Sequence, residues 1–408
     1  MGSNLIGLVG IATILTIAVL LSTNRRAINF RIVGAAFALQ VVVATLVLYT
    51  DGGTNVLNRL SGWVMAVIGF SRDGIEMVFG PLANEEFLGE ISFAVHVLPI
   101  IIFFSALMSV LYYLRIMQWI VKIFGTILHK IIGTGPIESM NAAANVFVGQ
   151  TESPLVVRPY LKGLTEPQFY AVMVSGVASV AGTVLAAYAS FGADMKFLLA
   201  ASFMAAPGGL LMAKILMPDD PADLTGRHDD FKIEKSDHEN IFLAAATGAT
   251  DGLRLAVNIG AMLIAFVALI ALFNGVIGGV AGWFGLDLTL EKILGFVFAP
   301  LMYLLSIPWA EAPAAGALFG EKLILNEFVA FYHMSDVLVD ASDRTRAIVT
   351  FSLCGFANLS SIAILLGGLG VLVPERRQLI ARFGLRAVAA GSLSNLMSAA
   401  LAGMLLTF

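Results

Sequence analysis

Long apolar runs separated by short polar segments make up most of the chain. A membrane-spanning helix needs roughly 20 mostly apolar residues, and eight stretches combine that length with few charges. They cover residues 4–22, 30–49, 91–114, 167–190, 194–216, 254–274, 345–372 and 380–407. We therefore predict an all-α membrane protein with eight transmembrane helices.

Two further apolar stretches carry charges at intervals and fit a spanning helix badly. Residues 56–78 and 114–132 alternate apolar positions with arginine, lysine and acidic side chains. A helix with one apolar face and one charged face lies in the membrane interface. We expect interfacial helices in both places.

Glycines, prolines and carboxylates break two other apolar stretches, Gly133–Lys162 and Trp309–His333. Irregular backbone is tolerated at membrane depth only where protein or a water-filled cavity satisfies its polar groups. These stretches therefore predict two re-entrant helical hairpins. In contrast, the polar run Pro218–Asn240 predicts an aqueous loop, and its His228 and His238 have no metal-ligand spacing.

Two short segments resemble each other, "SGVAS" at residues 175–179 and "CGFAN" at residues 354–358. Each follows a carboxylate in one of the broken stretches, because Ser179 comes 27 residues after Glu152 and Asn358 comes 31 residues after Glu327. Three predicted helices separate the two repeats, and an odd number reverses their orientation. An inverted repeat with broken helices is typical of secondary transporters, whose substrate binds where the broken elements meet.

Composition supports a membrane setting. Apolar residues make up 58% of the 408 residues and charged residues only 13%, where a soluble domain has about 25% charged residues. The net charge is −4 and the basic residues form no stripe, so nucleic acid is not an expected partner. The single cysteine, Cys354, excludes an internal disulfide and a multi-cysteine metal site. Basic residues cluster on one side of the predicted helices, which places both termini away from the cytoplasm.

Polar groups at the first hairpin are suited to bind a small polar ligand. Gln150 and Thr151 supply donors and acceptors, Gly149 allows close approach of the backbone, and Pro154 suits the first turn of a helix that starts at the hairpin tip. A carboxylate such as Glu152 is costly within the membrane and is expected to face a cavity or a partner. Capping of the hairpin turn is the alternative role for it.

The second repeat offers a matching set. Asn358 and Ser361 are three positions apart and share a helix face, with Phe356 close by. Together with Glu327 they could hold a hydroxyl-rich ligand, although hydrogen bonding between helices and ordinary packing would use the same residues. Structural roles are also open for Glu311, Glu321 and the histidines His96 and His333.

Three motifs are similar to those of the concentrative nucleoside transporters, in particular the bacterial members: "GQTESP" at residues 149–154, "PWAEAPAAGALFGEKLILNEFVAF" at 308–331 and "CGFANLSSIAILLGGLG" at 354–370. The resemblance extends over nearly the whole chain. It implies import of a uridine-like nucleoside by alternating access. The implied substrate-binding residues are Gln150, Thr151 and Glu152 at the nucleobase, Val184, Leu255 and Phe356 as its apolar wall, and Glu327, Asn358 and Ser361 at the ribose.

The resemblance also implies sodium as the coupling ion. Asn145 and Ser179 would bind it with their side chains, and Val148 and Val180 with their backbone carbonyls. A proton-coupled nucleoside symporter is the alternative, because Glu152 and Glu327 could carry protons, but proton-coupled relatives differ at the position of Asn145. No other cofactor is implied.

The family further implies a homotrimer in the bacterial inner membrane. Its division into scaffold and mobile transport domain implies scaffold segments at 1–125 and 218–285 and transport segments at 126–217 and 286–408. A membrane enzyme is disfavoured because the chain has neither His-Glu-x-x-His nor Gly-x-Ser-x-Gly. A channel is disfavoured because two inverted hairpins that close on one site favour alternating access over a continuous pore.

Overall fold

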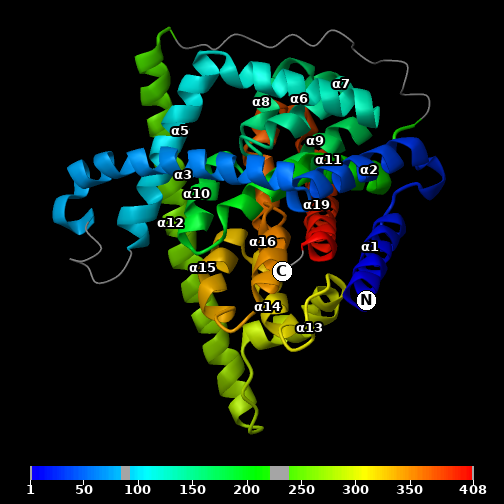
Figure 1. Ribbon diagram of the computed structural model, residues 1–408, viewed down its shortest axis with the longest axis vertical. Helices are drawn as coiled ribbons and strands as arrows, with labels where there is room; N and C mark the ends of the chain where they lie inside the picture. Colours follow the sequence, from blue (N-terminus) through cyan, green and yellow to red (C-terminus); the bar gives the residue numbers. More distant parts are fainter. Residues whose placement is uncertain (1, 84–91, 221–238, 407–408) are drawn as a thin grey trace.

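Every regular element that the structure describes is a helix (Figure 1). The structure is a computed structural model, and it describes residues 2–83, 92–220 and 239–406. Six of its helical segments are long and apolar enough to cross a membrane. The prediction of an all-α fold is confirmed.

The first third of the chain contains three apolar helices and two helices with a charged face. The elements are α1 (Gly2–Leu20), α2 (Phe30–Leu48), α3 (Asp51–Phe79), the π-helical turn Phe93–Val97, α5 (Leu98–Tyr113) and α6 (Ile116–Ile132). The apolar helices are α1, α2 and α5, and the helices with a charged face are α3 and α6. The amphipathic α3 runs across the direction of the other long helices (Figure 1), as expected of an interfacial helix.

The longest helix is α12 (Ile241–Gly282), which packs along α5. Ala244, Gly248 and Gly252 repeat every four residues on its buried face. A Cβ added at Gly248 would lie 2.5 Å from the Cβ of Ser109, and one at Gly252 would lie 2.7 Å from the Cβ of Ser105. Small residues at this spacing let two membrane helices approach closely, so the glycines explain the α5–α12 pair.

The predicted repeat is present as a repeated order of elements. The first copy has α6, α7 (Pro136–Ala144), α8 (Ser153–Val156), α9 (Glu166–Ala178), α10 (Gly182–Ser190) and α11 (Met195–Leu216). The second has α13 (Leu290–Leu304), α14 (Ala312–Ile324), α15 (Glu327–Val337), α16 (Asp343–Leu353), α17 (Ser360–Gly367), α18 (Leu369–Leu372) and α19 (Arg377–Leu405). In Figure 1, α6 and α7 lie at one end of the molecule and α13 and α14 at the other, as expected of inverted copies.

Two predicted helices are interrupted in the structure. The segment predicted over 167–190 is broken after Ala178, and the one predicted over 345–372 is broken after Leu353. Both breaks fall on the repeated segments "SGVAS" and "CGFAN". The first break places Gly182 against the first hairpin, where its amide donates to the carbonyl of Phe147 at 3.0 Å. Sequence hydropathy misses both breaks because their residues are as apolar as the helices around them.

Two other boundaries differ from the prediction. The sixth predicted helix, 254–274, is the middle of the 42-residue α12. Helix α13, which packs along α14, was not predicted, because Glu291, Lys292 and Pro300 interrupt its apolar run. Most of the predicted aqueous loop, with His228 and His238, lies outside the described residues.

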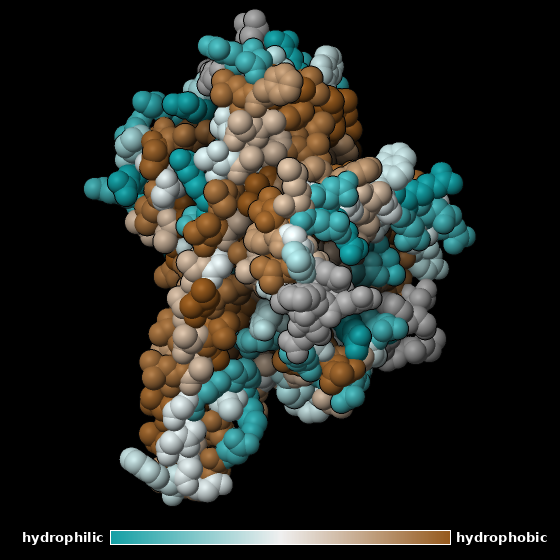
Figure 2. All heavy atoms as spheres, turned by 90° about the vertical axis from the view of Figure 1, so that its left-hand side faces the viewer, coloured by the Kyte–Doolittle hydropathy of each residue, from teal (hydrophilic) through white to brown (hydrophobic). Residues whose placement is uncertain are grey.

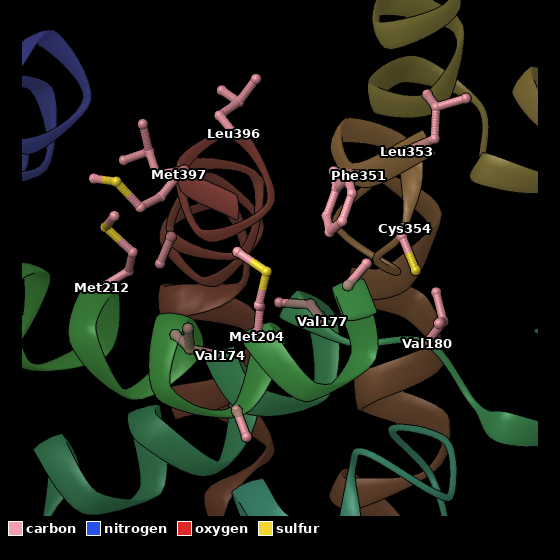
Figure 3. Packing of buried hydrophobic residues seen from close by; sticks show 14 of the residues in the cluster. Val174, Val177, Val180, Met204, Met212, Phe351, Leu353, Cys354, Leu396 and Met397 are labelled. Carbon is pink, nitrogen blue, oxygen red and sulfur yellow. The ribbon is translucent and has the colours of Figure 1, made fainter. Parts of the chain in front are cut away.

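Helices α11 and α19 form the centre of the core. Helix α11 is almost entirely buried, and α19 is buried over most of its length from Ala387 onward. The two helices pack against each other, and both also contact α9 and α16. Figure 3 shows part of this cluster: Met204 and Met212 come from α11, Leu396 and Met397 from α19, and Val180 and Cys354 from the two breaks. The broken segments are therefore held from one side by two continuous helices.

Candidate functional site

The first hairpin turns between α7 and α8. Its turn is closed by the carboxylate of Glu152, whose Oε2 accepts a hydrogen bond from the amide of Gly149 at 2.7 Å. Pro154 lies in the first turn of α8, as predicted. Thr151 and Glu152 are exposed, whereas Gln150 is buried. Glu152 thus does cap the turn while the residue remains exposed.

The second hairpin places Glu327 at the start of α15. Asn326 caps this helix by accepting from the amide of Val329 at 3.0 Å, which fixes the neighbouring Glu327 in a buried position, 3% exposed. The Glu327 carboxylate accepts from the Tyr188 hydroxyl at 3.1 Å and from Asn358 Nδ2 at 2.8 Å. Three elements, α10, α15 and the second break, therefore meet at one carboxylate.

Hydrogen bonds connect this carboxylate to the first hairpin. Asn358 Oδ1 accepts from the amide of Ser361 at 2.9 Å and from its hydroxyl at 3.1 Å. The Ser361 hydroxyl in turn lies 3.5 Å from Gln150 Nε2. A continuous row of polar side chains thus runs from Gln150 through Ser361 and Asn358 to Glu327 and Tyr188. The structure brings together most of the polar residues predicted for substrate binding.

The predicted apolar residues belong to the same continuous core. Val184 is buried and lies one helical turn before Tyr188 on α10, while Phe356 and Leu255 are half-buried. Leu255 comes from α12, which Figure 1 shows to the left of the central helix α19. Thr151 packs near Gly368, where an added Cβ would lie 2.8 Å from the Thr151 methyl carbon.

The predicted sodium ligands belong to the first hairpin and to the first break. Asn145 is buried at the end of α7; its Oδ1 accepts from the Ser153 hydroxyl at 2.8 Å and its Nδ2 donates to the Asn141 carbonyl at 3.0 Å. The Ser179 hydroxyl is buried and has no hydrogen-bond partner among the described residues. Val148 and Val180 are also buried.

These groups fit a monovalent cation. A buried hydroxyl without a partner costs free energy, and a bound cation would satisfy the Ser179 oxygen. Unwound backbone next to a helix end offers carbonyl oxygens, which suit sodium. Asn145 and Ser179 would supply neutral side-chain oxygens, and Val148 and Val180 would supply backbone oxygens.

The remaining candidates have ordinary structural partners. Glu311 is partly exposed and accepts from the amide and hydroxyl of Ser342, the residue that caps α16. Glu321 pairs with His333 at 3.0 Å. The ring nitrogens of His96 lie near the backbone carbonyls of Ser92 and Ala83. Cys354 is buried in the core.

Three residues near the site were not predicted from the sequence. Tyr188 holds Glu327, and Lys322 and Asn395 form a buried network beside the two breaks. The signal for Lys322 was available, because a lysine within a broken apolar hairpin is as costly as a glutamate. Tyr188 and Asn395 lie in apolar helices where one polar residue is unremarkable.

The family comparisons cover nearly the whole chain. The model described as "Na+ dependent nucleoside transporter C-terminus" matches residues 197–403, the corresponding N-terminus model matches 9–82, and a model described as "Nucleoside recognition" matches 94–195. The third model contains both the first hairpin and the first break. The first contains Glu327, Asn358 and Ser361.

Similar proteins match this chain over nearly their full lengths. A transporter of Haemophilus influenzae described as uncharacterized is 51% identical, and the nucleoside permease NupC of Helicobacter pylori is 47% identical, each over 98% of both chains. Solved structures of CNTnw match with a TM-score of 0.93 and 50% identity in an inward-facing substrate-bound state, and with 0.94 and 49% for a variant in an outward-facing state. Each match covers 99% of this chain and 98% of the other. These relatives are transporters rather than enzymes, and the chain belongs to the family of concentrative, sodium-dependent nucleoside transporters.

Proposed function

We propose that this protein imports uridine-like nucleosides together with sodium by alternating access. The observation that carries the proposal is the row of hydrogen bonds from Gln150 to Glu327, because it joins both hairpins and the second break at one place. A substrate bound there would contact both repeats. Binding would then be sensitive to movement of either repeat.

The two ends of the row suit the two parts of a nucleoside. Glu327 is an acceptor for ribose hydroxyls, which would add to its bonds from Tyr188 and Asn358. At the other end, Gln150 Oε1 is buried and without a partner among the described residues, so it can accept from a nucleobase. Thr151 and Glu152 are exposed beside it. Val184, Phe356 and Leu255 would form the apolar wall for the base.

Sodium would bind next to the base-contacting turn. Asn145 and Val148 precede Gln150 in the same hairpin, so an ion held there and at Ser179 and Val180 would fix the turn against the first break. The amide of Gly182 already ties this break to Phe147 of the hairpin. Sodium binding would thereby complete the nucleoside site.

One sodium ion per nucleoside is enough to drive accumulation. Moving one charge through about 100 mV releases roughly 2.3 kcal/mol, and a tenfold sodium gradient adds roughly 1.4 kcal/mol. Together they sustain a concentration ratio of several hundred for a neutral substrate.

We further propose the family's division of labour for this chain. The segments 126–217 and 286–408 would move as a transport domain against scaffold segments 1–125 and 218–285. Three copies would associate in the bacterial inner membrane, with both termini on the periplasmic side. Figure 2 shows a band of apolar side chains along α12, which includes the exposed Val257, Ile264 and Leu272. This face would contact lipid or a second copy.

Uptake of labelled uridine into proteoliposomes tests the proposal, with sodium and proton gradients imposed separately. We expect saturable accumulation that depends on an inward sodium gradient and is abolished when sodium is equal on both sides. Accumulation driven by a proton gradient alone would favour the proton-coupled alternative. Uridine flux that only equilibrates under every gradient would exclude a symporter.

A further inference from the structure

Asn395 of α19 contacts both broken helices at once. It is 2% exposed, and its Nδ2 donates to the carbonyl of Ala178 at 2.6 Å and to the carbonyl of Cys354 at 3.0 Å. Ala178 is the last residue of α9 and Cys354 follows the last residue of α16. One carboxamide therefore joins the carbonyl ends of the two helices that the breaks terminate.

The remaining atom of this carboxamide binds a lysine. Asn395 Oδ1 accepts from Nζ of Lys322 at 2.7 Å, and the same Nζ donates to the carbonyl of Ser352 at 3.0 Å. Lys322 lies in the last turns of α14, and its side chain is fully buried. Both of these partners are neutral. A buried ammonium is costly, and here the carbonyls at the end of α16, the negative end of the helix dipole, stabilise it.

The position of Lys322 corresponds to that of the proposed sodium ion in the first repeat. Sodium would lie between the end of α7, at Asn145, and the end of α9, at Ser179. The Lys322 ammonium lies between the last turns of α14 and the end of α16. The first repeat would thus bind an exchangeable cation at the place where the second repeat holds the side-chain amine of Lys322.

The two breaks are also in direct contact and tightly packed. The amide of Phe356 donates to the carbonyl of Ser179 at 3.1 Å. A Cβ added at Gly391, one turn before Asn395, would lie 2.9 Å from Val177 and 3.0 Å from Ala357. Neither break can shift without disturbing the other or breaking the bonds of Asn395.

We propose that Asn395 and Lys322 are positioning residues that transmit sodium occupancy from the first break to the nucleoside site at the second. This role rests on the proposed sodium and nucleoside sites. Sodium at Ser179 and Val180 fixes the first break, Asn395 carries that constraint to Cys354, and the Phe356–Asn358 segment next to it binds the nucleoside. Lys322, by donating to Asn395 Oδ1, orients the carboxamide so that its Nδ2 reaches the carbonyls of both breaks.

The coupling is measurable as the factor by which saturating sodium tightens uridine binding. We would measure the dissociation constant of labelled uridine for purified full-length protein with sodium and with choline, in wild type and in Asn395→Ala and Lys322→Met. The expected result is a coupling factor at least fivefold smaller in both variants, with uridine affinity in choline within about threefold of wild type.

Ser398→Ala is the matched control. Ser398 is a buried polar residue one turn further along α19, and its hydroxyl accepts from Gln40 at 3.0 Å and donates to the carbonyl of Ser394 at 3.2 Å. Its coupling factor should equal that of wild type. Variants that keep the full coupling factor, or that lose uridine affinity equally with and without sodium, would overturn the proposal. If Asn395→Ala does not fold, Lys322→Met tests the same link from its other end. If the uridine affinity of the wild-type protein were the same with and without sodium, the proposed function itself would be refuted.

Discussion

The two repeats place similar elements around their breaks, but they differ in how the buried polar groups there are hydrogen-bonded. At the second break, Asn358 bonds both Ser361 and Glu327. Lys322 bonds the carbonyl of Ser352, and Asn395 bonds that of Cys354. At the first break and its hairpin, the buried oxygens Ser179 Oγ, Thr183 Oγ1 and Gln150 Oε1 have no partner among the described residues. Asn326 Nδ2 in the second hairpin likewise has no partner among the described residues, but the second break itself is preorganised, whereas the first break needs ligands to complete it.

This difference assigns different tasks to the two halves. A preorganised site contributes affinity with little ordering cost, because its side chains are already fixed. A half whose polar atoms need a ligand is ordered by that ligand, which makes its conformation depend on ligand concentration. We therefore expect substitutions in the second repeat to change nucleoside affinity and substitutions in the first repeat to change sodium dependence.

The largest effect is expected from Glu327→Gln. This substitution removes the charge that accepts from Tyr188 and Asn358, and it weakens the acceptor for ribose hydroxyls. Two weakened bonds to a charged group amount to about 3 kcal/mol, or roughly a 100-fold loss of uridine affinity. Equilibrium binding at saturating sodium measures it.

A substrate analogue and a control variant sharpen this test. The loss should shrink to less than about fivefold for 2′,3′-dideoxyuridine, which has no ribose hydroxyls to bind. Glu311→Gln, in the second repeat's hairpin region but paired only with Ser342, should leave uridine affinity unchanged. An equal loss for both nucleosides would place Glu327 away from the ribose.

A smaller effect, of a different kind, is expected from Asn145→Ala. Loss of a buried amide among the sodium ligands costs about 2 kcal/mol, which corresponds to a rise of roughly 30-fold in the half-saturating sodium concentration for uridine uptake. Asn274→Ala removes an amide that bonds Glu291 outside both sites, and it should leave the sodium dependence unchanged. Full sodium stimulation in the Asn145 variant would remove Asn145 from the ion site.

The sequence predicted the hairpins and most helices of both repeats, but it missed α13 and the breaks within two of the helices. Glu152, Glu327, Asn358 and Ser361 were predictable because a polar residue in a membrane segment is costly and therefore informative. The breaks after Ala178 and Leu353 were not, because tertiary contacts such as the bond from Phe356 to Ser179 stabilise them rather than local composition.

The contribution of α19 was equally hidden in the sequence. An asparagine such as Asn395 in an apolar helix is compatible with many roles. Only its hydrogen bonds to Ala178 and Cys354 show which role it has. Assignment of the nucleoside depended on the resemblance of three motifs to a known family. Composition and periodicity alone predicted only a polar ligand between two hairpins.

Tyr188→Phe tests how far nucleoside binding depends on the hydrogen bonds that hold Glu327 in place. The change removes one hydroxyl that donates to Glu327 and keeps the ring that stacks on Phe331 at 4.3 Å. Because Asn358 still holds the carboxylate, we expect a cost of about 1 kcal/mol and a loss of roughly fivefold in uridine affinity. Tyr170→Phe is the matched control, since its hydroxyl bonds the carbonyl of Arg386 away from the site. Equal effects of the two variants would reduce Tyr188 to a packing role.

The smallest effect separates ligand binding from packing at the first break. Ser179→Ala removes a buried hydroxyl with no partner among the described residues, so thermal stability without sodium should not fall, and it retains the carbonyl that accepts from Phe356. With one of several neutral ligands removed, the half-saturating sodium concentration should rise about threefold to fivefold, which corresponds to roughly 0.7 to 1 kcal/mol. Ser392→Ala removes another buried hydroxyl without a described partner, on α19, and should change neither quantity. If neither serine variant changes the half-saturating sodium concentration, the Ser179 hydroxyl does not bind the ion. The first repeat would then hold sodium by Asn145 and backbone carbonyls alone.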